Sequence, residues 1–157
     1  MIENEILEKL SNRTITYIRD DLEMVNIDNS FSIEEVEKID YYDITTLISL
    51  SGSIGGTVGM SVSNKLAIEM VKNFIFGDME DDELKEMSIE NISETLNITL
   101  GNILPELTTI KNGNKVEIST PYTMHNSVTI TKKKNGIMLL SSIQYDNDDK
   151  VLLSYFR

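Results

Sequence analysis

Three stretches of the chain carry apolar residues at helical spacing, and they predict helices over about residues 3–24, 64–76 and 84–105. Ser63 is placed to cap the second helix, and Gly77 follows its expected end. This second helix presents two apolar rows at i,i+4 spacing, which are Leu66, Met70 and Phe74 in one row and Ala67, Val71 and Ile75 in the other.

β-branched and alternating apolar residues fill most of the remaining sequence and predict strands. Glycines within 52–56 separate two such runs, which is typical of a hairpin turn. A phosphate-binding loop is disfavoured there because no Gly-Lys-Ser/Thr follows. Asn135-Gly136 predicts a second hairpin between the runs on its two sides. The predicted strands lie within residues 44–62, on both sides of the glycines, and at 116–120, 127–133, 136–145 and 151–156.

Residues 25–42 carry no decisive pattern. Ser32 and Glu35 have the spacing of a capping box, but the apolar residues around them suit extended chain equally well. The other elements predict an α/β fold of the α+β type, with a single predominantly antiparallel sheet packed against long helices. A chain of 157 residues has the length of one domain with a real core, and we expect residues 1–157 to form it.

Charge and composition exclude several classes of function. The 14 Lys and Arg against 26 Asp and Glu give a net charge of −12, which would repel nucleic acid or an anionic membrane. Because the chain has no Cys and one His, a disulfide framework, a Cys nucleophile and a Cys- or His-rich metal site are excluded. The N-terminus resembles no signal peptide, and no apolar run approaches the roughly 20 residues that span a bilayer. We therefore expect a soluble, cytoplasmic protein without a metal site.

The predicted helix over 84–105 separates apolar from polar residues. At about 100° per residue, Glu90, Glu94, Asn97 and Gly101 share one exposed flank. Glu94 and Asn97 place a carboxylate beside a carboxamide, and Gly101 leaves the next turn bare. Spacing alone favours a solvated surface, although Asn and Gly are each about 0.5–1 kcal/mol poorer than Ala inside a helix. The stripe expected to be buried consists of Ile89, Ile92, Leu96, Leu100, Ile103 and Leu107.

The segment 93–102 reads Ser-Glu-Thr-Leu-Asn-Ile-Thr-Leu-Gly-Asn. It resembles the Glu-x-x-Asn-x-x-x-Gly-Asn helix of the CheC/CheX/FliY family of chemotaxis phosphatases. The glycine-bearing strand pair before it and the Pro121-bearing strand after it follow the same order, so that the resemblance covers about residues 40–130. Two departures stand out. Glu90 occupies a position where the family usually has Asp or Ser, and the spacing from Asn97 to Pro121 is one residue longer than usual.

The resemblance implies dephosphorylation of the aspartyl phosphate of a CheY-like response regulator in chemotaxis or two-component signalling. It implies that Asn97 orients the hydrolytic water and that Glu94 pairs with the active-site Lys of the partner. Glu90, Gly101 and Pro121 are expected to contribute to partner binding. No cofactor of its own is implied, because Mg²⁺ belongs to the regulator, and the resemblance implies a homodimer.

The resemblance also bears on the number of sites. The CheC type carries two such helices and the CheX type carries one. In this chain the first predicted helix offers Glu8 and Asn12, which are four residues apart and have no Gly-Asn after them. A single site of the CheX type is therefore expected. The single His125 follows Pro121 in a predicted loop, where a structural role is favoured over phosphate acceptance.

Two other functions remain open. Flagellar switch components share the fold, so the chain could be a binding module that docks on a response regulator without hydrolysing its phosphate. The intact Glu94 and Asn97 pair favours hydrolysis over this alternative. The second alternative is a purely structural oligomer formed through the edges of the sheet.

Overall fold

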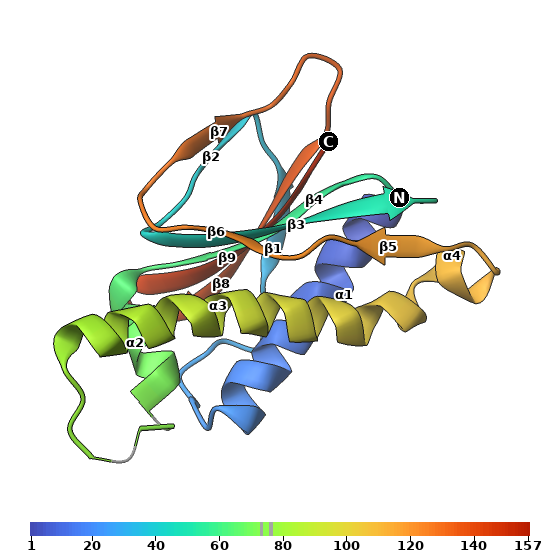
Figure 1. Ribbon diagram of the computed structural model, residues 1–157. Coiled ribbons are helices and arrows are strands. Elements are labelled where there is room, and N and C mark those ends of the chain that lie inside the picture. The colour runs from blue at the N-terminus through green and yellow to red at the C-terminus, as the bar shows by residue number, and fades with distance from the viewer. Residues whose placement is uncertain (73, 76) are drawn as a thin grey trace.

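In the described part of the chain, a seven-stranded antiparallel sheet and the helices on one of its faces form the body of the protein (Figure 1). The computed structural model describes residues 1–72, 74–75 and 77–157. In chain order the elements are α1 (Ile2–Thr16), a π-helical turn (Tyr17–Asp21), β1 (Ser32–Glu35), β2 (Lys38–Asp40), β3 (Ile44–Gly52), β4 (Gly56–Val62), α2 (Asn64–Lys72), α3 (Asp81–Ile103), a 3₁₀ turn (Leu104–Glu106), α4 (Thr108–Lys111), β5 (Val116–Ile118), β6 (Tyr122–Met124), β7 (Thr129–Thr131), β8 (Met138–Tyr145) and β9 (Asp149–Phe156).

The sheet has the strand order β1-β8-β9-β4-β3-β5, and β6 pairs with β3 beside β5. Its centre joins the β3–β4 hairpin to the β8–β9 hairpin, since β4 pairs with β9 from Thr57↔Phe156 to Ser61↔Leu152. The separate ribbon β2–β7 lies over the face opposite the helices (Figure 1). These pairings are all antiparallel, which confirms the predicted fold class.

The main core lies between the sheet and the helices α1 and α3. Most of the predicted stripe is buried there: Ile92, Leu96 and Leu100 have no exposed surface. Ile89 is only partly buried, and buried Leu107 lies beyond the end of α3. Ile39 of β2, with Tyr41 and Met138, forms a second, smaller cluster under the β2–β7 ribbon. The two clusters use opposite faces of the sheet, because successive residues of a strand point in opposite directions.

One predicted hairpin is wrong. Asn135 has a positive φ of 63°, and the Gly136 N–H donates to the Lys133 carbonyl at 2.9 Å, so the turn exists. The strands on its two sides do not pair with each other, however. Ile130 of β7 pairs with Ile39 and covers the second cluster, whereas β8 pairs with β9 and β1. The burial of Ile39 beneath the β2–β7 ribbon therefore decides the partner of β7, and the local turn at Asn135-Gly136 does not.

The ends of the first two predicted helices also differ from the structure. The first becomes π-helical at Tyr17 and ends at Asp21, and the unassigned segment 25–42 supplies β1 and β2. Ser63 caps α2 as expected, since its hydroxyl oxygen accepts the Leu66 N–H at 3.1 Å. Because α2 ends at Lys72, Phe74 is 49% exposed and not part of a buried row. Residues 73 and 76 of the predicted helix lie outside the described residues.

Candidate functional site

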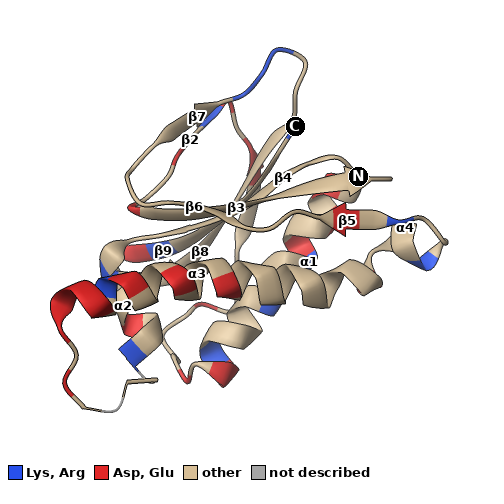
Figure 2. Ribbon diagram, in the orientation of Figure 1, with Lys and Arg blue, Asp and Glu red and all other residues tan. Residues whose placement is uncertain are grey.

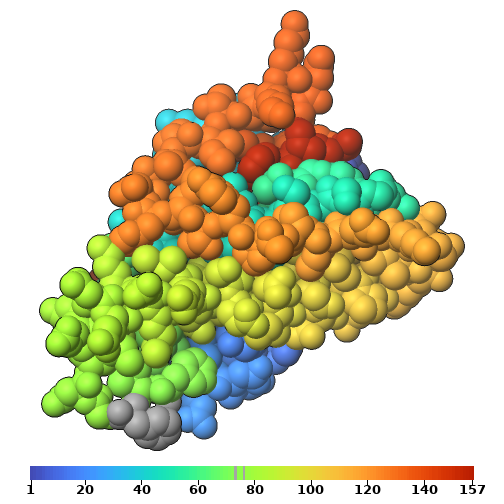
Figure 3. All heavy atoms as spheres, viewed as in Figure 1, coloured from blue at the N-terminus to red at the C-terminus, as the bar shows by residue number. Residues whose placement is uncertain are grey.

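Helix α3 is held against the sheet by a buried face that fixes its rotation. Beside the apolar stripe, the buried hydroxyls of Thr95 and Thr99 each donate to the carbonyl four residues earlier, at 2.7 Å. These bonds satisfy polar groups that would otherwise be costly to bury. The opposite side of α3 therefore faces solvent along the face seen in Figure 3.

Glu94 and Asn97 lie on the outward flank of α3, as predicted. Glu94 is exposed and Asn97 is partly buried. Within the described residues, neither side chain has a hydrogen-bond or ion-pair partner. A carboxylate can accept and a carboxamide can both donate and accept, so the pair is free to bind a partner molecule.

The other predicted site residues take different places around this pair. Glu90 is exposed one turn before Glu94, and Gly101 is exposed one turn after Asn97. A methyl group added at Gly101 would meet nothing within 4 Å, so the surface beside Asn97 is open. Pro121 is partly buried in the connection from β5 to β6, which runs alongside α3 in Figure 1. The structure thus gathers Glu90 and Gly101 onto the flank and places Pro121 on a neighbouring segment.

A hollow of about 390 Å³ lies beside the flank, between α2 and α3. Its lining combines apolar groups, two glutamates and one carboxamide, which are Val71, Phe74, Met87, Glu90, Asn91 and Glu94. Sequence reasoning missed Phe74, Met87 and Asn91, because the hollow forms only where two helices meet. The weak signal in the sequence was the apolar surface of Phe74 at the end of its predicted helix.

Acidic side chains continue along α3 from the site toward its N-terminus (Figure 2). Glu83, Glu86, Glu90 and Glu94 fall within a sector of about 80° on the helix surface, at 100° per residue. All four are exposed. Negative charge near the first turn suits the helix dipole, but Glu90 and Glu94 lie too far along the helix for that effect.

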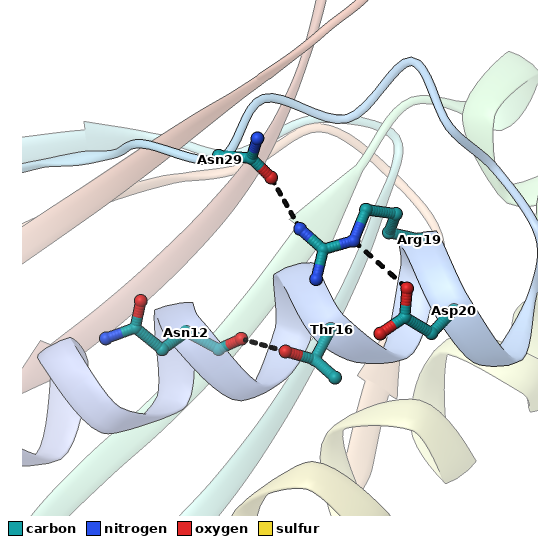
Figure 4. Close-up of polar contacts among 5 residues, drawn as sticks. All are labelled: Asn12, Thr16, Arg19, Asp20 and Asn29. Carbon is teal, nitrogen blue, oxygen red and sulfur yellow. Dashed lines mark hydrogen bonds and ion pairs between the residues drawn. The ribbon is translucent and has the colours of Figure 1, made fainter.

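Helix α1 offers a second asparagine in different surroundings (Figure 4). Glu8 and Asn12 are both exposed, and the Thr16 hydroxyl donates to the Asn12 carbonyl at 3.1 Å. Lys9 and Arg13 line the same hollow as Asn12. One turn farther on, Arg19 donates to Asp20 and Asn29. This helix therefore lacks the free, acidic flank of α3.

Among the residues that the structure describes, no three His, Asp or Glu side chains are grouped to hold a metal ion. None of the described helices is both long enough and apolar enough to cross a membrane.

The family of the chain follows from a comparison with family models. The model described as chemotaxis phosphatase CheX matches residues 44–140, which include β3, α2, α3 and the Glu94 and Asn97 pair. The chain therefore belongs to the CheX family, as its motifs predicted. No curated protein sequence matches it.

Solved structures agree with this fold. A chemotaxis protein CheX from Desulfovibrio desulfuricans is similar with a TM-score of 0.71 at 15% identity, covering 96% of this chain and 97% of that one. The CheX-CheY-BeF3-Mg+2 complex from Borrelia burgdorferi gives 0.69 at 20% identity, with 97% of each chain covered. FliY of Thermotoga maritima gives 0.54 at 12% identity, covering 99% and 88%.

Proposed function

We propose that this protein removes the phosphoryl group from the aspartyl phosphate of a CheY-like response regulator. The observation that carries the proposal is the Glu94 and Asn97 pair, which lies unpartnered on the exposed flank of α3 in a member of the CheX phosphatase family. The relative from Borrelia burgdorferi, whose structure is a complex with CheY, supports the choice of partner. The proposed setting is the cytoplasm, where such regulators act.

Asn97 is proposed to orient the attacking water. The oxygen of the water bonds to phosphorus while the bond from phosphorus to the aspartyl oxygen breaks. The aspartate leaves as a carboxylate, and the phosphorus leaves as dihydrogen phosphate with both hydrogens of the water. Such a transfer needs positioning more than covalent help. A carboxamide suits this role because it hydrogen-bonds the water without bringing a negative charge toward the phosphoryl group.

Glu94 is proposed to form an ion pair with the active-site lysine of the regulator. This contact fixes the register in which Asn97 enters the partner's site, three residues along the same helix. Glu90, Gly101 and Pro121 are proposed to contact the partner around this pair. The Mg²⁺ ion is expected on the regulator and supplies charge neutralisation at its phosphate.

The test is the rate at which a regulator, phosphorylated by a small-molecule donor, loses phosphate with and without this protein. We expect wild type to accelerate the loss and Asn97→Asp to leave it at the basal rate, since a carboxylate repels the phosphoryl oxygens. A protein that binds the regulator without accelerating phosphate loss would instead be a binding module, and the phosphatase proposal would be wrong.

A homodimer formed through sheet edges is also proposed. The described sheet ends in the short strand β1 on one side and in β5 and β6 on the other, and open edges pair readily. Light scattering at micromolar concentration should give twice the chain mass of 17.8 kDa. A monomeric mass would remove this proposal without affecting the site.

A further inference from the structure

A groove runs along α3 from Glu94 toward the N-terminus of the helix. The 390 Å³ hollow between α2 and α3 shares Met87 and Glu90 with a second hollow of about 240 Å³. The second hollow adds Met79, Glu83 and Glu86 to the lining. The two hollows therefore adjoin at Met87 and Glu90, and we name them together the α3 groove.

The floor of the α3 groove is apolar and adaptable. Phe74 is 49% exposed, and Met79 and Met87 are partly buried. Covering such surface with apolar groups of a partner is favourable. Methionine is unbranched and polarisable, so it moulds to side chains of different shape.

The rim of the groove is acidic. Glu83, Glu86, Glu90 and Glu94 are exposed, and within the described part of the chain none of them has an ion-pair partner. This rim matches a basic partner. A second copy of this chain, with a net charge of −12, would meet repulsion instead.

Asn91 adds a polar group without a partner. Its side-chain amide nitrogen is buried, and no hydrogen-bond acceptor among the described residues reaches it. A buried donor without an acceptor is costly, so an acceptor brought by a partner is favoured. Asn91 lines the groove one turn from Glu94, so that a rotation of its side chain toward the groove would present this donor to the acceptor.

We propose that the α3 groove binds a basic, amphipathic segment of the response regulator itself. Apolar side chains of the segment pack on Phe74 and Met87, and its Lys or Arg side chains pair with the glutamates of the rim. A carbonyl oxygen accepts from Asn91. This mode is that of an amphipathic segment in a groove. The inference rests on the proposed function, since the groove begins at Glu94 and thus faces the same partner.

Charge reversal far from Asn97 tests the rim. Glu86 lies 11 residues from Asn97, about 16 Å along the helix. We expect Glu83→Lys/Glu86→Lys to raise the KM for the phosphorylated regulator about tenfold at low salt and to leave kcat unchanged, because these side chains contact only the bound partner. The rise should shrink in about 0.5 M salt. The control Glu8→Lys/Glu23→Lys makes the same charge change at exposed positions of α1 and of the loop that follows the π-helical turn, and it should alter KM less than twofold.

A second variant tests the floor. Met87→Ala should raise KM severalfold with little dependence on salt, and a thermal melt by circular dichroism confirms that it folds. Unchanged KM in both groove variants would overturn the groove proposal and leave Asn97 untouched. If Met87→Ala instead changes the oligomeric state but not KM, the groove is an interface between copies, and the proposal is wrong.

A direct measurement separates the groove from hydrolysis. Should the wild-type protein fail to accelerate phosphate loss, the same variants are titrated with the regulator held by beryllium fluoride and Mg²⁺. Weaker binding of the regulator by the groove variants then supports the groove proposal even though the phosphatase proposal fails. Equal binding of the regulator by wild type and both groove variants overturns the groove proposal.

Discussion

Helices α1 and α3 pack on the same face of the sheet, and each presents a glutamate and an asparagine to solvent, yet they differ in how many of their acids are bound within the fold. Glu8 of α1 has no partner among the described residues, but two other acids of this helix do: buried Glu3 pairs with Arg157 at 3.0 Å, and Glu5 accepts from the Thr108 N–H at 2.7 Å. The acids along the flank of α3 have no partner among the described residues. A surface whose charges are left unpaired is available to another molecule.

The residue one turn after each asparagine shows the same contrast. In α1 this residue is Thr16, whose hydroxyl donates to the Asn12 carbonyl and whose side chain occupies the next turn. In α3 it is Gly101, which leaves the turn beside Asn97 open. The difference teaches that the chemistry of a helical Glu and Asn pair depends on its surroundings as much as on its spacing.

The largest expected effect separates the two asparagines. Asn97→Ala should lower stimulated phosphate loss by about 100-fold or more, the usual effect of removing one positioned polar group. Asn12→Ala should leave the rate unchanged. Both variants should fold, since Ala is the better helix former by several tenths of a kcal/mol. A rate assay and a thermal melt on both variants suffice, and near-normal activity of Asn97→Ala would remove α3 from the chemistry.

Substitution of Glu94 should affect regulator binding more than substitution of Glu8, by a smaller factor than separates the two asparagines. Glu94→Ala loses an ion pair with the partner and should weaken regulator binding about tenfold, or about 1.4 kcal/mol. Its deficit should shrink as salt rises, because salt screens an exposed pair. Glu8→Ala is the matched control and should bind as wild type does. Titration of the regulator at two salt concentrations measures both, and a salt-independent deficit would contradict the ion pair.

The glycine of α3 can be tested against the threonine of α1. Gly101→Ala should raise the free energy of unfolding by about 0.5–1 kcal/mol, because its methyl group meets no neighbour and Ala suits a helix. The same methyl group should lower phosphatase activity severalfold, since the partner must approach the backbone there. Thr16→Ala should leave activity unchanged. Urea unfolding and the rate assay check the two effects, and full activity of Gly101→Ala would show that close approach is unnecessary.

The smallest effect concerns acid stability. The hydrogen bond from the backbone N–H of Thr108, helped by a second from its hydroxyl, lowers the pKa of Glu5 from 4.5. The folded state therefore binds this proton less readily than the unfolded chain, and the stabilisation is present above about pH 4.5 and lost as pH falls through the folded pKa. Glu5→Gln should be slightly less stable than wild type near pH 7, and the difference should shrink as pH falls below about 4.5. Glu94→Gln removes a carboxylate without a partner and should match wild type near pH 7, and urea midpoints compare the proteins.

The sequence predicts the periodic parts of this molecule well. The apolar stripe of α3 is regular over several turns, so its burial and the outward flank with Glu94 and Asn97 follow from helical geometry alone. The β3–β4 hairpin is predicted equally well, because its glycines and alternating residues agree.

Other features depend on contacts between distant segments and could not be predicted. Ile39 pairs with Ile130, although 90 residues separate them in the sequence. The sequence around each residue does not indicate that the other is its partner. The α3 groove arises where Phe74, which follows α2, lies opposite Met87 of α3. The proposed role of Asn97 came from the order of the motifs along the chain. Its spacing from Glu94 alone indicates only an ordinary surface residue.

The central position of β9 has a consequence for how the protein is made. Residues 149–156 leave the ribosome after all their neighbours in the sheet, yet they separate β4 from β8. Before they emerge, both of those strands have an unpaired edge, and contacts between distant segments form slowly in any case. The nascent chain is therefore most prone to aggregate after β8 has emerged and before β9 follows it. Deleting the eight residues of β9 would leave two halves of a sheet with nothing to join them.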